Sequence, residues 1–286
     1  MSYAEIRDFL NTYYEIDGRI VIRGFKVWVY GNVVANPHSK FNFENLTNNL
    51  FEFAEVTGDF DCSYFFRLKS LENGPEVVGG NYIIHGCKEL TSLVGSPLKV
   101  KGDFEVKHLN ITSLKGCTPV IGGKFDIRGN EKLKSLQYCP TSVGGDFIVQ
   151  SCKSLKSLRH VPKVLNKDFN CAWCSSLTTL KYGPKVVNGV YTIYGCPIES
   201  LEGCPSYIDG YFEMGYNKEL KSLQGFPSHL KGSFYIVECP KLESFEGIKP
   251  FEDDEFGFRL MPKHLSDEIS KRPELRKKHL RTSSWG

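Results

Sequence analysis

The sequence lacks any long hydrophobic segment, and no apolar run approaches the roughly 18 residues of a membrane-spanning helix. It also lacks a strong charge of either sign, with a formal net charge of +3 over 286 residues. This balance excludes an acidic mimic of DNA and is far below the basic excess of a dedicated nucleic-acid-binding protein. Residues 1–8 carry acids and no apolar segment, so we expect no signal peptide and a cytoplasmic location, where thiols stay reduced.

Motifs for catalysis or metal binding are also missing. The seven histidines form no HExxH motif and no close pair. Gly123-Lys124 is not a phosphate-binding loop, because Phe125 stands where that motif requires serine or threonine. Cys171 and Cys174 form a CxxC motif, but no second one accompanies it. We therefore expect a protein that is not an enzyme and has no catalytic residues, cofactor or metal.

The dominant feature of the sequence is a repeat of 21 or 22 residues. Each unit has an aromatic residue two positions after its start and a small or apolar residue two positions further on. This alternation predicts a short strand with one buried face. The nine units start at Gly58, Gly80, Gly102, Gly123, Gly145, Lys167, Gly189, Gly210 and Gly232.

The rest of each unit is also regular. A pair of aliphatic residues such as Leu68 and Leu71 follows the strand, and a proline then favours an extended return segment. The eighth position is mostly asparagine or cysteine, a side chain suited to binding backbone groups where the chain turns. All ten cysteines fall on repeat positions, which predicts a structural role for them. One unit cannot bury its apolar side alone, so neighbouring units must stack.

The repeat resembles a known group of proteins. Gly58-Asp59-Phe60-Asp61-Cys62-Ser63 followed by Leu68-Lys69-Ser70-Leu71 is similar to units of the leucine-rich-repeat-like proteins encoded by tailed bacteriophages. The similarity covers about residues 41–250. It implies a viral accessory protein in the cytoplasm of an infected bacterium. The expected fold is a β-rich, leucine-rich-repeat-like solenoid of about nine repeats with parallel strands.

Two capping segments are predicted to flank the solenoid of residues 58–250. Residues 1–57 would form an N-terminal cap with a helix at 2–14, two strands within 18–31 and a degenerate repeat at 41–57. Residues 251–286 would form a C-terminal cap with a helix at 266–280 that starts from Ser266 as its N-cap. The basic tail residues either belong to this polar cap or dock on an acidic partner or nucleic acid. They are Arg276, Lys277 and Lys278.

Two surfaces are candidates for binding. The outward strand positions are acidic in the first units, where Asp126 and Arg128 are among them, and tyrosine-rich in the last ones, with Trp173 and Tyr216 at the edge. Rigid amphipathic rings suit a protein interface, but aromatic rings also stabilise neighbouring strands. The predicted partner-binding face consists of Tyr194, Tyr211, Tyr235, Val190, Glu213, Val237 and Ile148.

The second surface is a basic stripe on the return segments of the central units. It is either a solvated face or a site for a phosphate backbone or an acidic partner. The stripe consists of Lys134, Lys156, Arg159, His160 and Lys181. Taken together, the sequence favours a non-enzymatic protein-binding solenoid that inhibits or redirects a host protein, such as an antiviral defence component. The alternatives are a nucleic-acid-associated protein and a structural virion component. The sequence indicates no oligomeric state.

Overall fold

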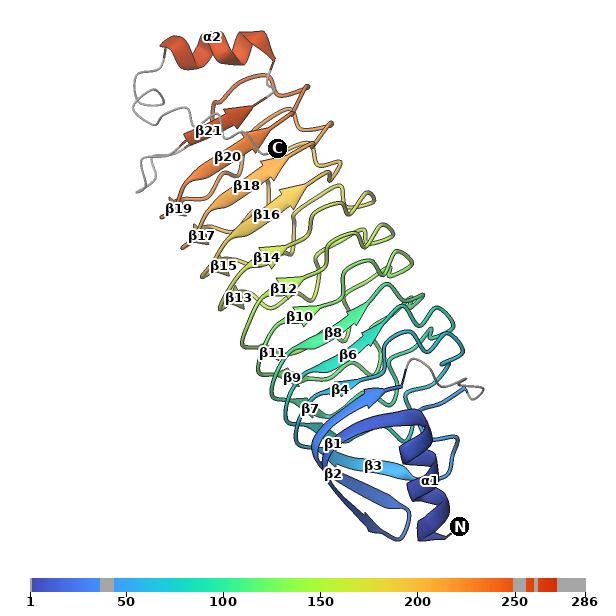
Figure 1. Ribbon diagram of the computed structural model, residues 1–286. Coiled ribbons are helices and arrows are strands. Elements are labelled where there is room, and N and C mark those ends of the chain that lie inside the picture. The colour runs from blue at the N-terminus through green and yellow to red at the C-terminus, as the bar shows by residue number, and fades with distance from the viewer. Residues whose placement is uncertain (1, 37–43, 249–255, 260–261, 272–286) are drawn as a thin grey trace. The chain divides into compact units, whose positions relative to one another are not determined.

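The structure is a computed structural model, which describes residues 2–36, 44–248, 256–259 and 262–271. The chain divides into two compact units, Met1–Ile148 and Val149–Gly286. Each is a parallel-strand β-solenoid (Figure 1), and together they carry about nine turns with repeats of about 22 residues. The predicted leucine-rich-repeat-like solenoid is confirmed.

Each turn of the first unit contributes to two parallel ladders of strands. The front ladder contains the aromatic position of each repeat, and its strands are β4 (Phe60–Asp61), β6 (Tyr82–His85), β8 (Phe104–Lys107), β10 (Phe125–Asp126) and β12 (Phe147–Ile148). The return ladder contains the closing aliphatic position, and its strands are β3 (Glu52–Val56), β5 (Val77–Val78), β7 (Lys99–Val100), β9 (Val120–Ile121) and β11 (Ser142–Val143).

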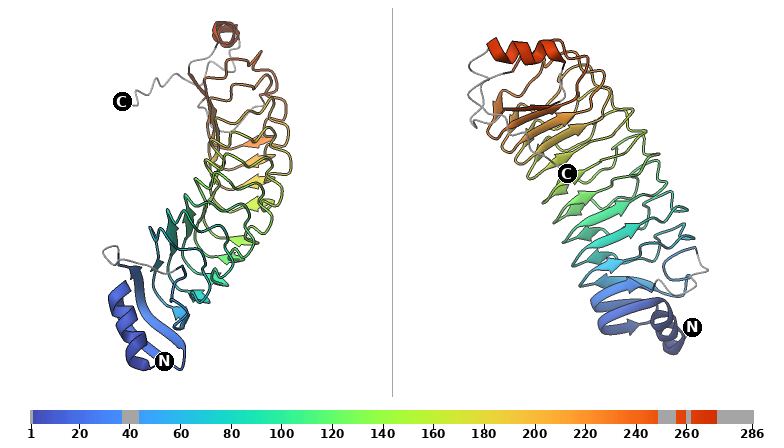
Figure 2. Two further views of the ribbon diagram at one scale, coloured as in Figure 1. Left: turned by 90° about the vertical axis from the view of Figure 1, so that its right-hand side faces the viewer. Right: turned by 45° about the horizontal axis from the view of Figure 1, so that its top comes forward.

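The second unit repeats this arrangement. Its front ladder consists of β14 (Phe169–Asn170), β16 (Tyr191–Tyr194), β18 (Phe212–Gly215), β20 (Phe234–Val237) and β21 (Phe256–Arg259). Its return ladder consists of β13 (Val164–Leu165), β15 (Val186–Val187), β17 (Tyr207–Ile208) and β19 (His229–Leu230). Figure 2 shows these turns from two further directions, with the two ladders along different sides of each turn.

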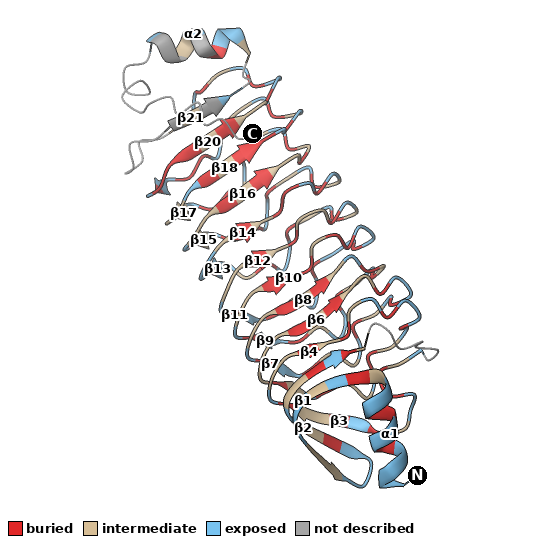
Figure 3. Ribbon diagram, in the orientation of Figure 1, coloured by how far each residue is buried: buried red, intermediate tan, exposed pale blue. Residues whose placement is uncertain are grey.

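The core of each unit is a column of aromatic rings from the front ladder. In the first unit, Phe60, Tyr82 and Phe104 are fully buried and stack with ring centroids 5.7 and 5.5 Å apart. In the second unit, Phe169 and Tyr191 stack at 5.4 Å. Buried and more exposed residues alternate along strands such as β8 and β16, as the period-2 pattern of the sequence predicts, and Figure 3 colours the residues by burial.

The N-terminal cap closes the first turn of the first unit. Helix α1 (Tyr3–Tyr13) begins with a capping box between Ser2 and Glu5, and its apolar side is buried. Strands β1 (Tyr14–Arg23) and β2 (Lys26–Ala35) form an antiparallel hairpin, and β2 pairs in parallel with β3 and β4. The predicted helix and strands are confirmed, and the strands are longer than expected.

The C-terminal helix differs from its prediction. Helix α2 (Lys263–Lys271) begins directly after Pro262, so Ser266 lies within it and the predicted N-cap at Ser266 is wrong. This earlier start, which follows the preference of proline for helix N-termini, places Leu265 where it is completely buried. The carboxylate of Glu268 accepts a hydrogen bond from the Phe245 backbone N–H at 3.0 Å, which satisfies a donor of the last repeat. No helix of the described residues is long and apolar enough to cross a membrane.

Candidate binding surfaces

Carboxylate or amide side chains of β2 and of the second position in the first units bind the backbone of the next turn. In each case a side-chain oxygen accepts a hydrogen bond from the N–H group one turn further on, at 2.7 to 2.8 Å. The side chains are those of Asn32, Asp59, Asn81 and Asp103, which bind Asp59, Asn81, Asp103 and Lys124 respectively. Asp59 and Asp103, which contribute to the acidic character of this face, therefore also join successive turns.

The asparagine and cysteine position joins turns in the interior. The side chain of Asn130 donates to the carbonyls of Val106 and Ile127 at 2.8 and 2.7 Å and accepts from the Leu109 N–H at 3.0 Å. At the same position, the Cys87 thiol donates to the Cys62 carbonyl at 3.4 Å. The predicted local role of this position is confirmed.

The cysteines are buried or half-buried thiols, and none forms a disulfide. Burial raises the pKa of Cys87 to about 12 and that of Cys239 to about 11, so both remain protonated at neutral pH. Cys171 and Cys174 of the CxxC motif are also buried, and burial raises the pKa of each thiol. In the described part of the chain, no three His, Cys, Asp or Glu side chains are arranged to hold a metal ion.

The tyrosines of the predicted partner-binding face lie on the front ladder of the second unit. Tyr194 lies on β16, Tyr211 directly before β18 and Tyr235 on β20, and Tyr211 and Tyr235 meet edge to face at 6.0 Å. Val190, Glu213 and Val237, from the same stretches of chain, are half-buried. Ile148, also half-buried, ends the first unit.

These tyrosines cover glycines on the neighbouring turn. A Cβ atom added to Gly215 would lie 3.0 Å from the ring of Tyr194, and one added to Gly232 would lie 2.9 Å from the ring of Tyr211. An aromatic ring packed over a glycine of the adjacent strand protects that backbone and fixes the ring. The alternative role, stabilisation of neighbouring strands, therefore applies to these residues whether or not they also bind a partner.

The structure brings two rings from beyond the ends of β14 and β18 together with Tyr194. Trp173 lies 5.7 Å from Tyr216, which lies 6.4 Å from Tyr194, and we call these three residues the ring cluster. The side chains of Trp173 and Tyr216 remain 45% and 37% exposed. Sequence reasoning placed both at the edge but did not predict this contact, because the repeat register does not reveal that rings two turns apart meet.

A carboxylate lies close to the ring cluster. Burial and the nearby charge of Asp168 raise the pKa of Glu213. Burial, Glu213 and Tyr216 together raise the pKa of Tyr194 to about 12. Within the described residues, Glu213 forms no salt bridge, so its charge is incompletely compensated.

The basic stripe is exposed but partly neutralised. Lys181 pairs with Glu202 at 3.0 Å, and the guanidinium of Arg159 lies 5.3 Å from the centre of the Tyr182 ring. Lys156 and His160 are exposed in the same unit, whereas Lys134 is exposed in the first unit. The basic tail residues Arg276, Lys277 and Lys278 lie outside the described residues.

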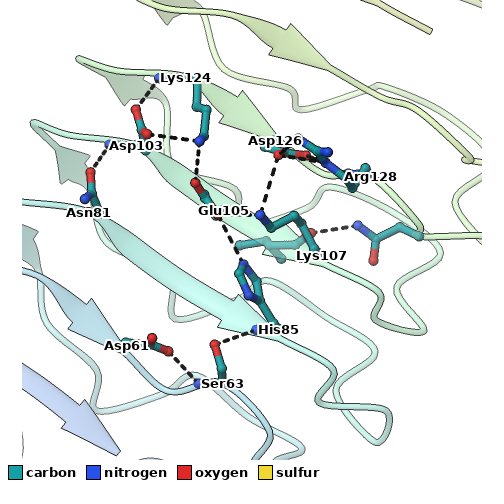
Figure 4. Close-up of polar contacts among 12 residues, drawn as sticks. Asp61, Ser63, Asn81, His85, Asp103, Glu105, Lys107, Lys124, Asp126 and Arg128 are labelled. Atoms are coloured by element: carbon teal, nitrogen blue, oxygen red, sulfur yellow. Dashed lines mark hydrogen bonds and ion pairs between the residues drawn. The ribbon is translucent and has the colours of Figure 1, made fainter. Parts of the chain in front are cut away.

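Sequence reasoning missed a charge network on the front ladder of the first unit, shown in Figure 4. Asp126, predicted to face outward, is completely buried beneath a bidentate contact from Arg128. Glu105 contacts Lys107 and Lys124 at 2.5 and 2.6 Å. The long cationic side chains lie across the carboxylates of neighbouring strands, which buries an acid at an outward position.

This network should make the first unit sensitive to acid. Burial alone would raise the pKa of Glu105, but hydrogen bonds from Lys107 and Lys124 and their charges lower it to about 2. A lowered pKa stabilises the fold above the usual value of about 4.5, and this stabilisation is lost as the pH falls towards 2. We expect Glu105→Gln to cost about 1–2 kcal/mol at pH 7, after allowance for solvent screening, and much less at pH 2.

Urea unfolding of the full chain at pH 7 and pH 2 measures this difference. Glu76→Gln is the matched control, because Glu76 forms an exposed salt bridge with Lys26 at 3.3 Å in the same unit. Such a pair contributes about 0.5 kcal/mol or less. An equal loss for both variants at pH 7 would contradict the proposed importance of the network.

The chain was also compared with known proteins. No protein-family model, curated protein or solved structure matches it.

Proposed function

We propose that this protein is a non-enzymatic binding solenoid that docks a partner protein on the front ladder of its second unit. The ring cluster carries this proposal, because it places three adjacent aromatic side chains at the ends of neighbouring strands of this ladder. Because its repeats resemble those of phage-encoded proteins, we place its action in the cytoplasm of an infected bacterium. There it would bind a host protein, such as an antiviral defence component, and inhibit or redirect it by blocking its surface.

The geometry of the rings favours binding. Aromatic side chains that are already fixed lose little conformational entropy on association, and they dominate the energetics of many protein interfaces. Trp173 is held over Gly195, since a Cβ atom there would lie 2.2 Å from its ring. Tyr211 and Tyr235 extend the aromatic surface along the same ladder.

The charge of the face indicates the chemistry of the partner. Glu213 lies among the rings with an incompletely compensated carboxylate, and Asp168 is close enough to raise its pKa further. An arginine or lysine side chain from a partner could stack on the rings and pair with Glu213. We therefore propose a partner segment that carries exposed arginine or lysine beside apolar residues.

The double variant Trp173→Asn and Tyr216→Asn tests this proposal. Both positions have positive φ, +61° and +54°, which asparagine tolerates better than most residues. Partners captured by the wild-type chain from bacterial host lysate should be identified by mass spectrometry and their affinities then measured with purified protein. We expect the affinity of the double variant for the specific partner to be lower by about 30-fold or more, because two rings that dominate the binding energy are removed.

Tyr182→Asn provides the control. Tyr182 has a φ of +70° and is 57% exposed in the same unit, but its ring lies beside Arg159 of the basic stripe. Thermal unfolding should show that all variants remain folded. The proposal fails if the double variant retains the partner with wild-type affinity. If Tyr182→Asn alone abolishes binding, the interface lies on the basic stripe instead.

A further inference from the structure

A row of left-handed backbone positions follows the front ladder in each unit. In the first unit these are Tyr64, Gly86, His108 and Gly129, with φ between +57° and +73°. Side chains other than glycine rarely adopt this conformation, so tyrosine and histidine are stabilised here by their surroundings. Bulky residues and glycines alternate, which places a ring on every second turn.

The alternation has a steric reason. A Cβ atom added to Gly86 would lie 3.0 Å from the Tyr64 ring, and one added to Gly129 would lie 2.2 Å from the His108 ring. Each ring therefore lies over the glycine of the following turn. Trp173 and Gly195 show the same arrangement in the second unit.

The two units differ in the space above the middle glycine. In the second unit, Trp173 and Tyr216 meet over Gly195 with their centroids 5.7 Å apart. In the first unit, the corresponding space over Gly86 is an open hollow of about 570 Å³. This volume lies within the range of small-molecule sites. The side chains that line it are those of Tyr64, Phe66, His85, Lys88, Lys107, His108 and Arg128.

The lining of the hollow is cationic and aromatic, and no carboxylate contributes to it. Lys107 and Arg128 are partly balanced by Glu105 and Asp126 of the charge network. Arg128 binds Asp126 through Nε and Nη2, which leaves its Nη1 group available to a ligand. Lys88 is exposed and forms no salt bridge within the described residues, so it adds an uncompensated charge.

Two exposed aromatic residues complete the site. Tyr64 and Phe66 are 62% and 67% exposed, although the intervening Phe65 is buried. Flat rings beside cationic groups match a ligand that has both an aromatic portion and phosphate groups. Lys88, Lys107 and Arg128 come from three successive turns, a spread of about 10 Å, which suits several phosphates better than one.

We propose that this hollow binds a nucleoside polyphosphate. Its base would stack on Tyr64 and Phe66, and its phosphates would bind Lys88, Lys107 and the outer edge of Arg128. A neutral sugar carries no charge to pair with the cationic side chains. The carboxylates of an acidic peptide would pair with the cations but would not stack on the rings. The site lies in the first unit, so this proposal does not depend on the partner-binding face of the second.

Isothermal titration calorimetry of the full chain with ATP, without added divalent cations, tests the phosphate contacts. We expect one ATP per chain and a roughly fivefold weaker affinity for Lys88→Glu, because an exposed charge close to a phosphate is reversed. Lys115→Glu is the control, since Lys115 is also exposed in the first unit but does not line the hollow. Absence of binding at millimolar ATP, or equal effects of the two variants, would overturn the proposal.

A second variant tests the stacking. The double variant Tyr64→Asn with Phe66→Ser should lower the affinity for ATP several-fold. Its affinity for inorganic triphosphate should be unchanged, because only ATP has a base. Asparagine again suits the positive φ of residue 64, which is +63°. An unchanged affinity for ATP would refute the stacking role. Tighter binding of a single-stranded oligonucleotide without terminal phosphates than of ATP would show that the ligand is a strand and would also overturn the proposal.

Discussion

Replacement of Asn130 by alanine is expected to lower the free energy of unfolding of the first unit by about 3 kcal/mol. The side chain makes three hydrogen bonds, to the backbone of Val106, Leu109 and Ile127, at a position with no solvent exposure. Alanine removes all three and leaves buried backbone groups without this partner, each at a cost of about 1–3 kcal/mol when considered alone. These individual costs do not simply add, since the surrounding groups relax into the emptied space.

Asn130→Cys is the informative comparison. Cysteine occupies the equivalent position in the turn of Cys87, where the thiol donates to the carbonyl that corresponds to that of Val106. The cysteine variant should therefore recover part of the lost stability, leaving a loss of about 1–2 kcal/mol. Urea unfolding followed by circular dichroism measures both variants, with the transition of the first unit fitted separately if the two units unfold apart. Equal losses would show that this position acts by volume and not by hydrogen bonding.

The sequence was informative about the fold because each repeat states the same local pattern. The aromatic of the strand and the aliphatic residues after it recur in phase, and a residue such as Phe104 is buried between aromatic rings of the turns on both sides. Period and phase together define which side chains face inward. The N-terminal helix was predictable for a similar reason, since Ser2 and Glu5 form a local capping signal.

The surface was less predictable because it depends on contacts between turns. Asp126 occupies an outward position, and only the placement of Lys107 and Arg128 explains its burial. The contact between Trp173 and Tyr216 likewise depends on Gly195 between them, which leaves room for the rings to lean together. Long side chains such as those of lysine, arginine and tryptophan can reach several neighbours, and the repeat pattern alone does not predict which neighbour they contact.

Replacement of Gly123 by alanine is expected to cost about 3 kcal/mol or more. An added Cβ would lie 2.1 Å from Oδ1 of Asp103 and 2.7 Å from the carbonyl carbon of Gly102. Neither group can move without losing a hydrogen bond. Asp103 Oδ1 accepts one from the Lys124 N–H, and the Gly102 carbonyl accepts one from the Gly123 N–H, each at 2.8 Å. The single methyl group therefore breaks a connection between turns or strains the backbone.

Gly24→Ala and a double variant establish the cause. Gly24 has a φ of +61° but no atom within 4 Å of an added Cβ, so alanine there should cost only the left-handed backbone penalty of about 1–2 kcal/mol. In Asp103→Ala with Gly123→Ala, the closest clash disappears, and the combined loss should be smaller than the sum of the single losses. If Gly123→Ala proves no more harmful than Gly24→Ala in urea unfolding, or if the double variant is fully additive, close approach of the turns does not explain the repeated glycine. Sub-additivity would instead show that Gly123 and Asp103 act together. The absence of a side chain at Gly123 leaves room for Asp103 Oδ1, which accepts the hydrogen bond from the next turn.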